Sequence, residues 1–164
     1  MLSASIQDLM NNQIKHELYS AYLYLAMSTY LEAQNYPGAA KWMRSQAGEE
    51  VEHAMKFVDH IHDRGGRVTL QAIDQPPSEF GSLCDAFHGA LGHEQKVTAL
   101  IHNIYAQAVQ ENDYASQSFL TWFVNEQVEE EKSAGDVLTQ LERVGDNPAA
   151  LFMLDSQLGK RGEG

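Results

Sequence analysis

Residues 48–53 read Gly-Glu-Glu-Val-Glu-His, and they lie within a segment whose apolar residues recur with the period of an α-helix. Met43, Glu50 and Phe57 are seven residues apart, so they share one line along that helix, and His53 is one turn on from Glu50. A carboxylate therefore interrupts a line that is otherwise apolar, and an imidazole lies beside it on the same face. This interruption indicates a polar site inside a helical bundle.

Proline and glycine mark the ends of this helix, and similar signals divide the rest of the chain. Asn35-Tyr36-Pro37-Gly38 precedes the helix and Gly65-Gly66 follows it, while Ser82 and Asp85 predict a capping box at the start of a later helix. Asn147-Pro148 begins a short last helix, which is followed by a Gly-rich tail that we expect to fray. The predicted helices span residues 5–34, 37–64, 82–111, 114–144 and 147–158.

The lengths of the links predict how these helices are arranged. The links after 34 and after 111 are short, which makes the helices on either side antiparallel neighbours. Residues 65–81 can span roughly 55 Å when extended, more than the roughly 42 Å of a 28-residue helix. The sequence therefore predicts an all-α fold: a four-helix bundle with a long crossover between helices two and three and a short fifth C-terminal helix.

Each of the other long helices also carries polar residues on its apolar lines. Glu17 interrupts the line of the first helix, Glu94 that of the third, and Gln127 and Glu130 interrupt two adjacent lines of the fourth. With the directions set by the links, the heights in the bundle are roughly 18 Å for Glu17, 21 Å for Glu50, 25 Å for Glu94 and 20 Å for Gln127. The interruptions are therefore expected to meet at one level.

Carboxylates that meet in an apolar core cannot all stay ionised, because burial and mutual repulsion raise their pKa values. No Lys or Arg lies at the matching core positions, so we expect hard cations to neutralise them. Bridging carboxylates with one imidazole suit iron or manganese. Cys84 is the only cysteine, which excludes a thiolate zinc site.

Di-iron carboxylate bundles have a single Glu on each of two helices and Glu-x-x-His on each of the other two. Glu17 and Glu94 fit the single positions, and Glu50 with His53 fits one paired motif. The fourth helix departs from the pattern because it offers Gln127-x-x-Glu130. The second metal would then have oxygen ligands only, which predicts weaker and more exchangeable binding.

The composition is that of a globular chain. Its 164 residues suit one domain, so we expect residues 1–164 to form a single unit. No segment approaches the ~20 apolar residues that span a bilayer, and no secretory signal is apparent, so no membrane association and a cytoplasmic location are expected. The 23 acidic and 11 basic residues give a net charge of -12, which disfavours nucleic acid and favours cations.

The chain resembles bacterial non-haem ferritins of the ferritin-like di-iron carboxylate family over essentially its whole length. The motifs that carry this resemblance are Tyr-Leu-Tyr-Leu at 22–25, the stretch at 48–53, His-Glu-Gln at 93–95 and Asn-Glu-Gln-Val-Glu-Glu-Glu at 125–131. The resemblance implies iron storage and detoxification by a ferroxidase, which oxidises ferrous to ferric iron with dioxygen or hydrogen peroxide. It further implies that the iron is stored as a mineral inside a homo-oligomeric cage of twenty-four subunits, with the fifth helix around a four-fold axis.

The resemblance also assigns residues to a di-iron centre. The implied ligands are Glu17, Glu50 and His53 for the first iron, and Glu50, Glu94 and Glu130 for the second. Gln127 would contact these ligands without being one, and Tyr24 matches the tyrosine that neighbours the oxidation centre in similar proteins. Tyr24 also lies on a core line, where packing alone is the simpler interpretation.

A third, inward-facing iron site is implied at Glu49, Glu126 and Glu129, with Glu130 shared. Spacing alone equally allows these acids to be a solvated charged face. Haem is not expected, because Val51 follows the Glu of the first motif where haem-binding relatives have methionine.

Two other functions remain as alternatives. One is a rubrerythrin-like peroxide reductase, which would normally need an electron-donor module that this chain lacks cysteines to build. The other is a helical scaffold with an incidental metal site. The remaining histidines are expected at the surface or at helix ends: His16, His60, His62, His88, His93 and His102.

Overall fold

The computed structural model describes residues 1–163, which form five α-helices and no strand. These are α1 (Ala4–Ala33), α2 (Pro37–Asp63), α3 (Leu83–Gln110), α4 (Tyr114–Val144) and α5 (Pro148–Leu158). Each end lies within one residue of its predicted position, and the predicted all-α class is confirmed. Within the described range no helix is both long enough and apolar enough to cross a membrane.

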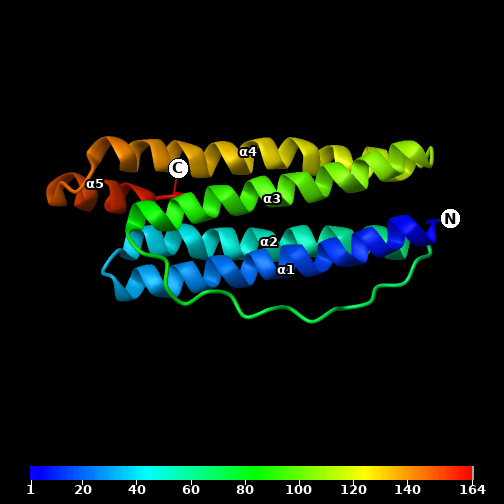
Figure 1. Ribbon diagram of the computed structural model, residues 1–164, viewed down its shortest axis with the longest axis horizontal. Helices are drawn as coiled ribbons and strands as arrows, with labels where there is room; N and C mark the ends of the chain where they lie inside the picture. Colours follow the sequence, from blue (N-terminus) through cyan, green and yellow to red (C-terminus); the bar gives the residue numbers. More distant parts are fainter. Residues whose placement is uncertain (164) are drawn as a thin grey trace.

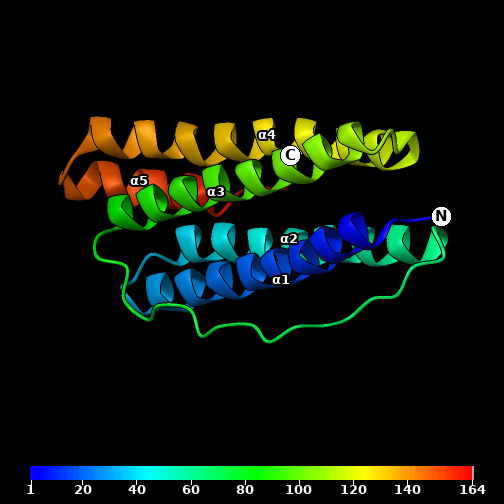
Figure 2. The ribbon, with the colours of Figure 1, turned by 45° about the vertical axis from the view of Figure 1, so that its right-hand side comes forward.

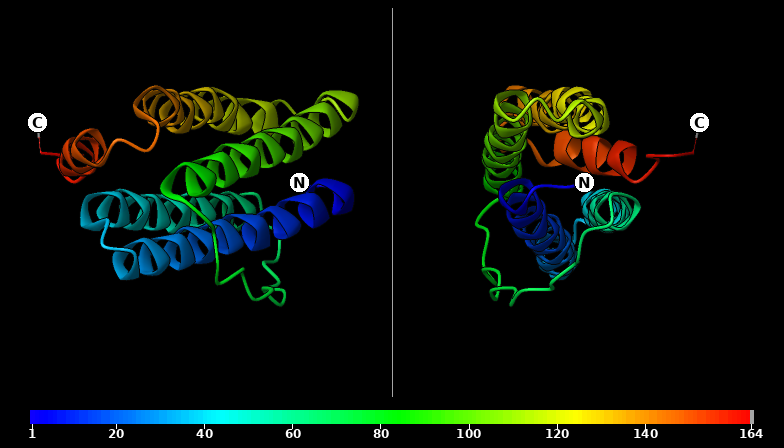
Figure 3. Two further views of the ribbon diagram at one scale, coloured as in Figure 1. Left: turned by 60° about the vertical axis from the view of Figure 1, so that its left-hand side comes forward. Right: turned by 90° about the vertical axis from the view of Figure 1, so that its right-hand side faces the viewer.

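The four long helices form a bundle of two antiparallel pairs, α1 with α2 and α3 with α4 (Figure 1). The segment between α2 and α3 runs back along the whole bundle, so these two helices are parallel, as predicted (Figure 2). Seen from its end, the bundle has α3 beside α1 and α4 above α2, while α5 lies along the side where α2 and α4 face each other (Figure 3).

The crossover is held against α1 at both of its ends. Near its start, the Asn11 side chain donates to Arg67 O (3.0 Å) and accepts from Thr69 N (2.9 Å). Near its end, the Tyr30 hydroxyl donates to Gly81 O (2.6 Å). These contacts explain how a segment without regular structure keeps a fixed course along the bundle.

The links begin and end where local chemistry favours them. Asn35 and Asn112 adopt left-handed backbone conformations, with φ of 64° and 55°, in the two short links. Such conformations are tolerated by Asn better than by most other residues. At the start of α3, Ser82 and Asp85 form the predicted capping box.

The hydrophobic core is divided into two clusters by a polar layer. One cluster contains Met27 and Phe87, and the other contains Phe57, Ile101 and Phe123. In all four long helices, the residues between the two clusters include the predicted polar interruptions. The bundle is thus tightly packed above and below one level at which it buries acids.

The short helix α5 is anchored to the start of α2. The buried Asp155 carboxylate accepts hydrogen bonds from Ala39 N (2.8 Å) and Gly38 N (3.2 Å), where a negative charge is favoured by the free N–H groups of a helix start. A side chain on Gly38 would not fit, because a Cβ there would lie 1.8 Å from Asp155 O. This close approach fixes the position of the chain that follows α5.

Candidate metal centre

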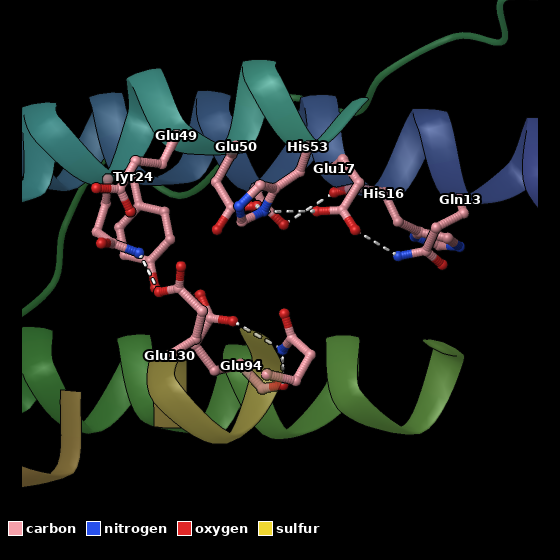
Figure 4. A network of polar contacts seen from close by, with 12 residues as sticks. Gln13, His16, Glu17, Tyr24, Glu49, Glu50, His53, Glu94 and Glu130 are labelled. Carbon is pink, nitrogen blue, oxygen red and sulfur yellow. Dashed lines mark hydrogen bonds and ion pairs between the residues drawn. The ribbon is translucent and has the colours of Figure 1, made fainter. Parts of the chain in front are cut away.

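Acidic side chains from all four long helices meet in the polar layer (Figure 4). Glu17 and Glu50 extend from α1 and α2 together with His53, and they face Glu94 of α3 and Glu130 of α4. None of the five is more than 4% exposed. The structure therefore places the predicted interruptions at one level inside the bundle.

The first group of potential ligands consists of Glu17, Glu50 and His53, each with one ligand atom within 4.8 Å of the others. His53 Nδ1 lies 3.3 Å from Glu50 Oε2 and 3.9 Å from Glu17 Oε2. Nevertheless, His53 Nδ1 and Glu17 Oε2 are buried without any hydrogen-bond partner. Buried polar atoms are normally paired, so an imidazole nitrogen and a carboxylate oxygen left unpaired side by side fit a cation.

The second group consists of Glu50, Glu94 and Glu130, again with ligand atoms within 4.8 Å of one another. Glu50 belongs to both groups, so its carboxylate can bridge two cations. Unlike Glu17 Oε2, both oxygens of Glu94 accept hydrogen bonds from protein donors. Glu94 accepts from the Tyr24 hydroxyl (2.5 Å) and from Gln127 Nε2 (3.1 Å).

The shared burial changes the protonation of these acids. Burial, reinforced by repulsion from Glu50, raises the pKa of Glu17 well above its usual value, and burial with Glu94 nearby does the same for Glu50. Burial and Glu94 raise the pKa of Glu130 to about 7. Without a cation the centre therefore holds protons near neutral pH, and a cation that binds must release them.

Tyr24 and Gln127 both lie against Glu94. Burial, with Glu94 close by, raises the pKa of Tyr24 well above its usual value, so its hydroxyl stays protonated and donates to the carboxylate. Gln127 Nε2 also donates to Glu94 O (3.2 Å) and lies 3.2 Å from Thr98 Oγ1. Both residues can orient the Glu94 carboxylate.

The three acids proposed for a third iron site are placed differently from one another. Glu126 joins His53 and Glu130 in a further group with ligand atoms within 4.8 Å. Glu49 is half-buried and forms an ion pair with Arg161 (3.3 Å). Glu129 is exposed, and neither it nor Glu49 belongs to a three-residue group found among residues 1–163.

Two amides that sequence analysis did not single out contact the acids directly. Gln13 Nε2 donates to Glu17 Oε1 (2.9 Å), and Gln46 Nε2 donates to Glu130 Oε2 (2.6 Å). Gln46 precedes His53 by seven residues, so the line that carries His53 is also polar one heptad earlier. Its position one heptad before His53 is the sequence signal that could have found it.

One expectation is corrected. His93 is only partly exposed: its Nε2 lies 2.7 Å from Ser20 Oγ, and burial lowers its pKa to about 4. The tail after α5 nevertheless makes contacts up to residue 163, where Arg161 contacts α2 and the Lys41 ammonium pairs with Glu163 (2.7 Å). Sequence periodicity gives no information on either contact, since the first depends on a neighbouring helix and the second on how the chain turns after α5.

Comparison with known proteins defines the class of this bundle and its buried acids. Residues 7–144 match the family model described as the ferritin-like domain. The chain therefore belongs to the ferritin family.

Among its relatives are two proteins named bacterial non-heme ferritin. The protein from Staphylococcus aureus (strain USA300) is 38% identical over 161 residues, which cover 98% of this chain and 97% of the relative. The protein from Bacteroides fragilis (strain 638R) is 40% identical and is covered completely, at 100% of its length. The resemblance to bacterial non-haem ferritins is thereby confirmed.

The fold is equally similar to a solved ferritin. A structure described as a novel open pore ferritin from the hyperthermophilic archaeon Archaeoglobus fulgidus superposes with a TM-score of 0.96 at 45% sequence identity. The match covers 97% of this chain and 98% of the archaeal one. The four-helix bundle with a short fifth helix is therefore a ferritin fold.

Proposed function

We propose that this protein stores iron and oxidises ferrous to ferric iron at the centre formed by the two ligand groups. The observation that carries this proposal is the pair of unpaired buried atoms, Glu17 Oε2 and His53 Nδ1, beside a carboxylate, Glu50, that belongs to both groups. Iron suits a site of carboxylates and one imidazole. Iron is here the substrate and the stored product.

In this proposal the first ferrous ion is bound by Glu17, Glu50 and His53, and the second by Glu50, Glu94 and Glu130. Each ion gives up one electron. The two electrons, with two protons, reduce one dioxygen to hydrogen peroxide, or one hydrogen peroxide to two waters. The carboxylates stabilise the higher charge of the ferric products.

The polar groups around the second position favour release of the product. Gln127, Tyr24 and Gln46 donate hydrogen bonds to Glu94 and Glu130, so these acids are not left unpaired when an ion leaves. Glu126, which shares a group with Glu130, offers the next carboxylate. We propose that Glu126, together with Glu49 and Glu129, forms the third iron site through which ions pass to the cavity.

The proposal includes self-assembly of the whole chain, residues 1–164 acting as one unit, into a cage of twenty-four subunits. Large apolar side chains on α5, Phe152 at 76% and Met153 at 71% exposure, are available for contacts between subunits. A cytoplasmic cage that binds neither nucleic acid nor membrane agrees with a net charge of -12 and with its iron cargo.

The experiment that tests the proposed function is aerobic addition of ferrous iron to the purified, metal-free protein. The initial rate of oxidation is compared in the wild type, His53→Ala and Glu130→Ala. His62→Ala and Glu142→Ala are matched controls, because both residues are exposed and lie on the same helices as the tested ones. We expect slow oxidation in the first two variants only, and equal rates in all five proteins would contradict the assigned roles.

The iron retained by each protein separates storage from a peroxide reductase. Storage predicts a mineral far in excess of two ions per subunit, whereas a reductase of the rubrerythrin type would retain only its centre. The measurement is the iron content of the protein after gel filtration, following repeated aerobic additions.

A further inference from the structure

The chain after α5 places a guanidinium group next to the metal centre. Arg161 donates to Gln46 Oε1 (2.5 Å) and to both carboxylate oxygens of Glu49 (3.3 Å each), and it also contacts Trp42 O (3.4 Å). Its guanidinium carbon lies 4.4 Å from the centre of the Trp42 ring. One side chain thus makes a polar, an ionic and a cation–π contact with consecutive turns of α2.

The position of Arg161 is determined by the anchoring of α5 and not by its own side chain alone. Asp155 binds the first N–H groups of α2, and a Cβ added to Gly159 would lie only 3.1 Å from Gly38 Cα. These contacts fix the backbone two residues before Arg161. The guanidinium is therefore presented to α2 as part of the fold.

Gln46 connects Arg161 to the metal centre. The amide is fully buried at 0% exposure; its oxygen accepts from Arg161 and its nitrogen donates to Glu130 Oε2 (2.6 Å). Because Arg161 can only donate, it fixes which end of the amide faces Glu130. Arg161 therefore orients a donor to Glu130 and neutralises Glu49, two acids assigned to neighbouring iron positions.

We propose that Arg161 is a tethered counter-cation that holds the Glu49 carboxylate until an iron ion displaces it. This inference rests on the proposed function, since it concerns the passage of iron from the di-iron centre through Glu49. The guanidinium is positively charged, so a divalent cation at Glu49 must either displace it or be repelled by it. Arg161 then disfavours the third position while the two ions of the centre are bound, and the tail of the chain sets how readily iron leaves.

The test is a titration of the assembled, metal-free protein with Co²⁺ alone, followed by calorimetry and by the absorption of bound Co²⁺. We compare the wild type with Arg161→Gln, Arg161→Lys and Lys160→Gln. The last variant is the matched control, because it removes one positive charge from an exposed neighbour in the same tail. The mass of the assembled protein shows that each variant is folded.

We expect the first two ions to bind all four proteins with similar affinity. In Arg161→Gln a third ion per subunit should bind at least about tenfold more tightly than in the wild type, because the competing charge is gone. Arg161→Lys should lie in between, since an ammonium keeps the charge but lacks the planar group that contacts Trp42 O and the Trp42 ring while it binds Gln46 and Glu49. Anomalous diffraction from Co²⁺ should place the additional ion at Glu49.

Two results would count against the inference in different ways. If two ions bind as expected but Arg161→Gln binds the third no more tightly than Lys160→Gln does, Arg161 is not a counter-cation of the third position, while the proposed function stands. If the wild type binds no Co²⁺ at the paired site, the proposed function is wrong and the inference is wrong with it.

Discussion

The two halves of the metal centre bury similar acids but differ in how the buried groups are hydrogen-bonded. In the half formed by α1 and α2, Glu17 Oε2 and His53 Nδ1 have no hydrogen-bond partner. In the half formed by α3 and α4, Glu94 accepts from Tyr24 and Gln127, and Glu130 accepts from Gln46. The first half therefore has buried polar atoms that only a cation would pair, whereas the acids of the second half already accept hydrogen bonds from the protein.

This difference determines which ion should be held more firmly. An ion in the first half relieves the cost of unpaired buried groups, and Glu17 Oε2 and His53 Nδ1 have no hydrogen bond to lose when it binds. An ion in the second half must compete with hydrogen bonds that already exist, and it finds oxygen ligands only. A firmly held ion beside an exchangeable one suits a centre that must release its product.

The largest effect on metal affinity is expected from removing one charge in each half. Glu17→Gln should weaken binding of the first ion about 100-fold, the upper end of the effects seen for changes around metal ligands. Glu94→Gln should spare the first ion and weaken only the second. Anaerobic titration with ferrous iron measures both affinities, and the comparison between the halves fails if both variants lose the same ion to the same extent.

The second prediction concerns the stability of the metal-free protein against pH. Burial and Glu94 raise the pKa of Glu130 to about 7 from 4.5. Between these pH values the folded protein keeps the Glu130 proton, whereas the unfolded chain releases it. The free energy of unfolding therefore falls as the pH rises from 4.5 through 7, and Glu130→Gln avoids this loss. From pH 5 to pH 8 the variant should gain up to about 3 kcal/mol in free energy of unfolding relative to the wild type.

Glu142→Gln is the control for that measurement, because Glu142 is an exposed carboxylate on the same helix. It should change stability by less than about 0.5 kcal/mol at either pH. Thermal unfolding followed by calorimetry at several pH values gives the comparison. A wild type that becomes steadily more stable than Glu130→Gln toward pH 8 would show that the sign of the proposed pKa shift is wrong.

Proline, glycine and capping signals, link lengths and heptad spacing together were sufficient to predict the five helices, the parallel course of α2 and α3, and the level at which Glu17, Glu50 and Glu94 meet. Each of these follows from periodicity, helix rise and link length, which are local properties of the sequence. The pairing of the acids could not be predicted in this way. Whether Glu94 receives a hydroxyl hydrogen bond depends on the angle at which α1 and α3 pack.

The contact between Arg161 and Glu49 is even harder to predict from the sequence. It depends on Asp155 capping α2 and on the close approach of Gly38 and Gly159. Neither glycine lies on a periodic line, and a Gly-rich tail is ordinarily read as a flexible end. Tertiary contacts with a large sequence separation decide this part of the site.

A third prediction concerns added charge in the half formed by α3 and α4. Gln127→Glu removes a donor to Glu94 and supplies a further carboxylate at the same level. We expect the second ion to bind about tenfold more tightly, equivalent to about 1.4 kcal/mol, and to be released to the mineral more slowly. The readouts are the second step of the anaerobic titration and the rate of iron turnover after the first addition; a second step that becomes no tighter would contradict the prediction.

The smaller effect on stability is expected when one donor to Glu94 is removed. Tyr24→Phe deletes the hydroxyl that donates to Glu94, and a lost hydrogen bond to a buried acid costs about 1–2 kcal/mol. The melting temperature of the metal-free protein should fall by about 2–8 °C, and by less once the centre is loaded, because the ion then stabilises the carboxylate. Tyr22→Phe on the same helix is the matched control, since Tyr22 is 49% exposed. Equal shifts for the two tyrosines would mean that the Tyr24 hydroxyl does not stabilise the acid, and the distinction between the two halves would then depend on Gln127 and Gln46 alone.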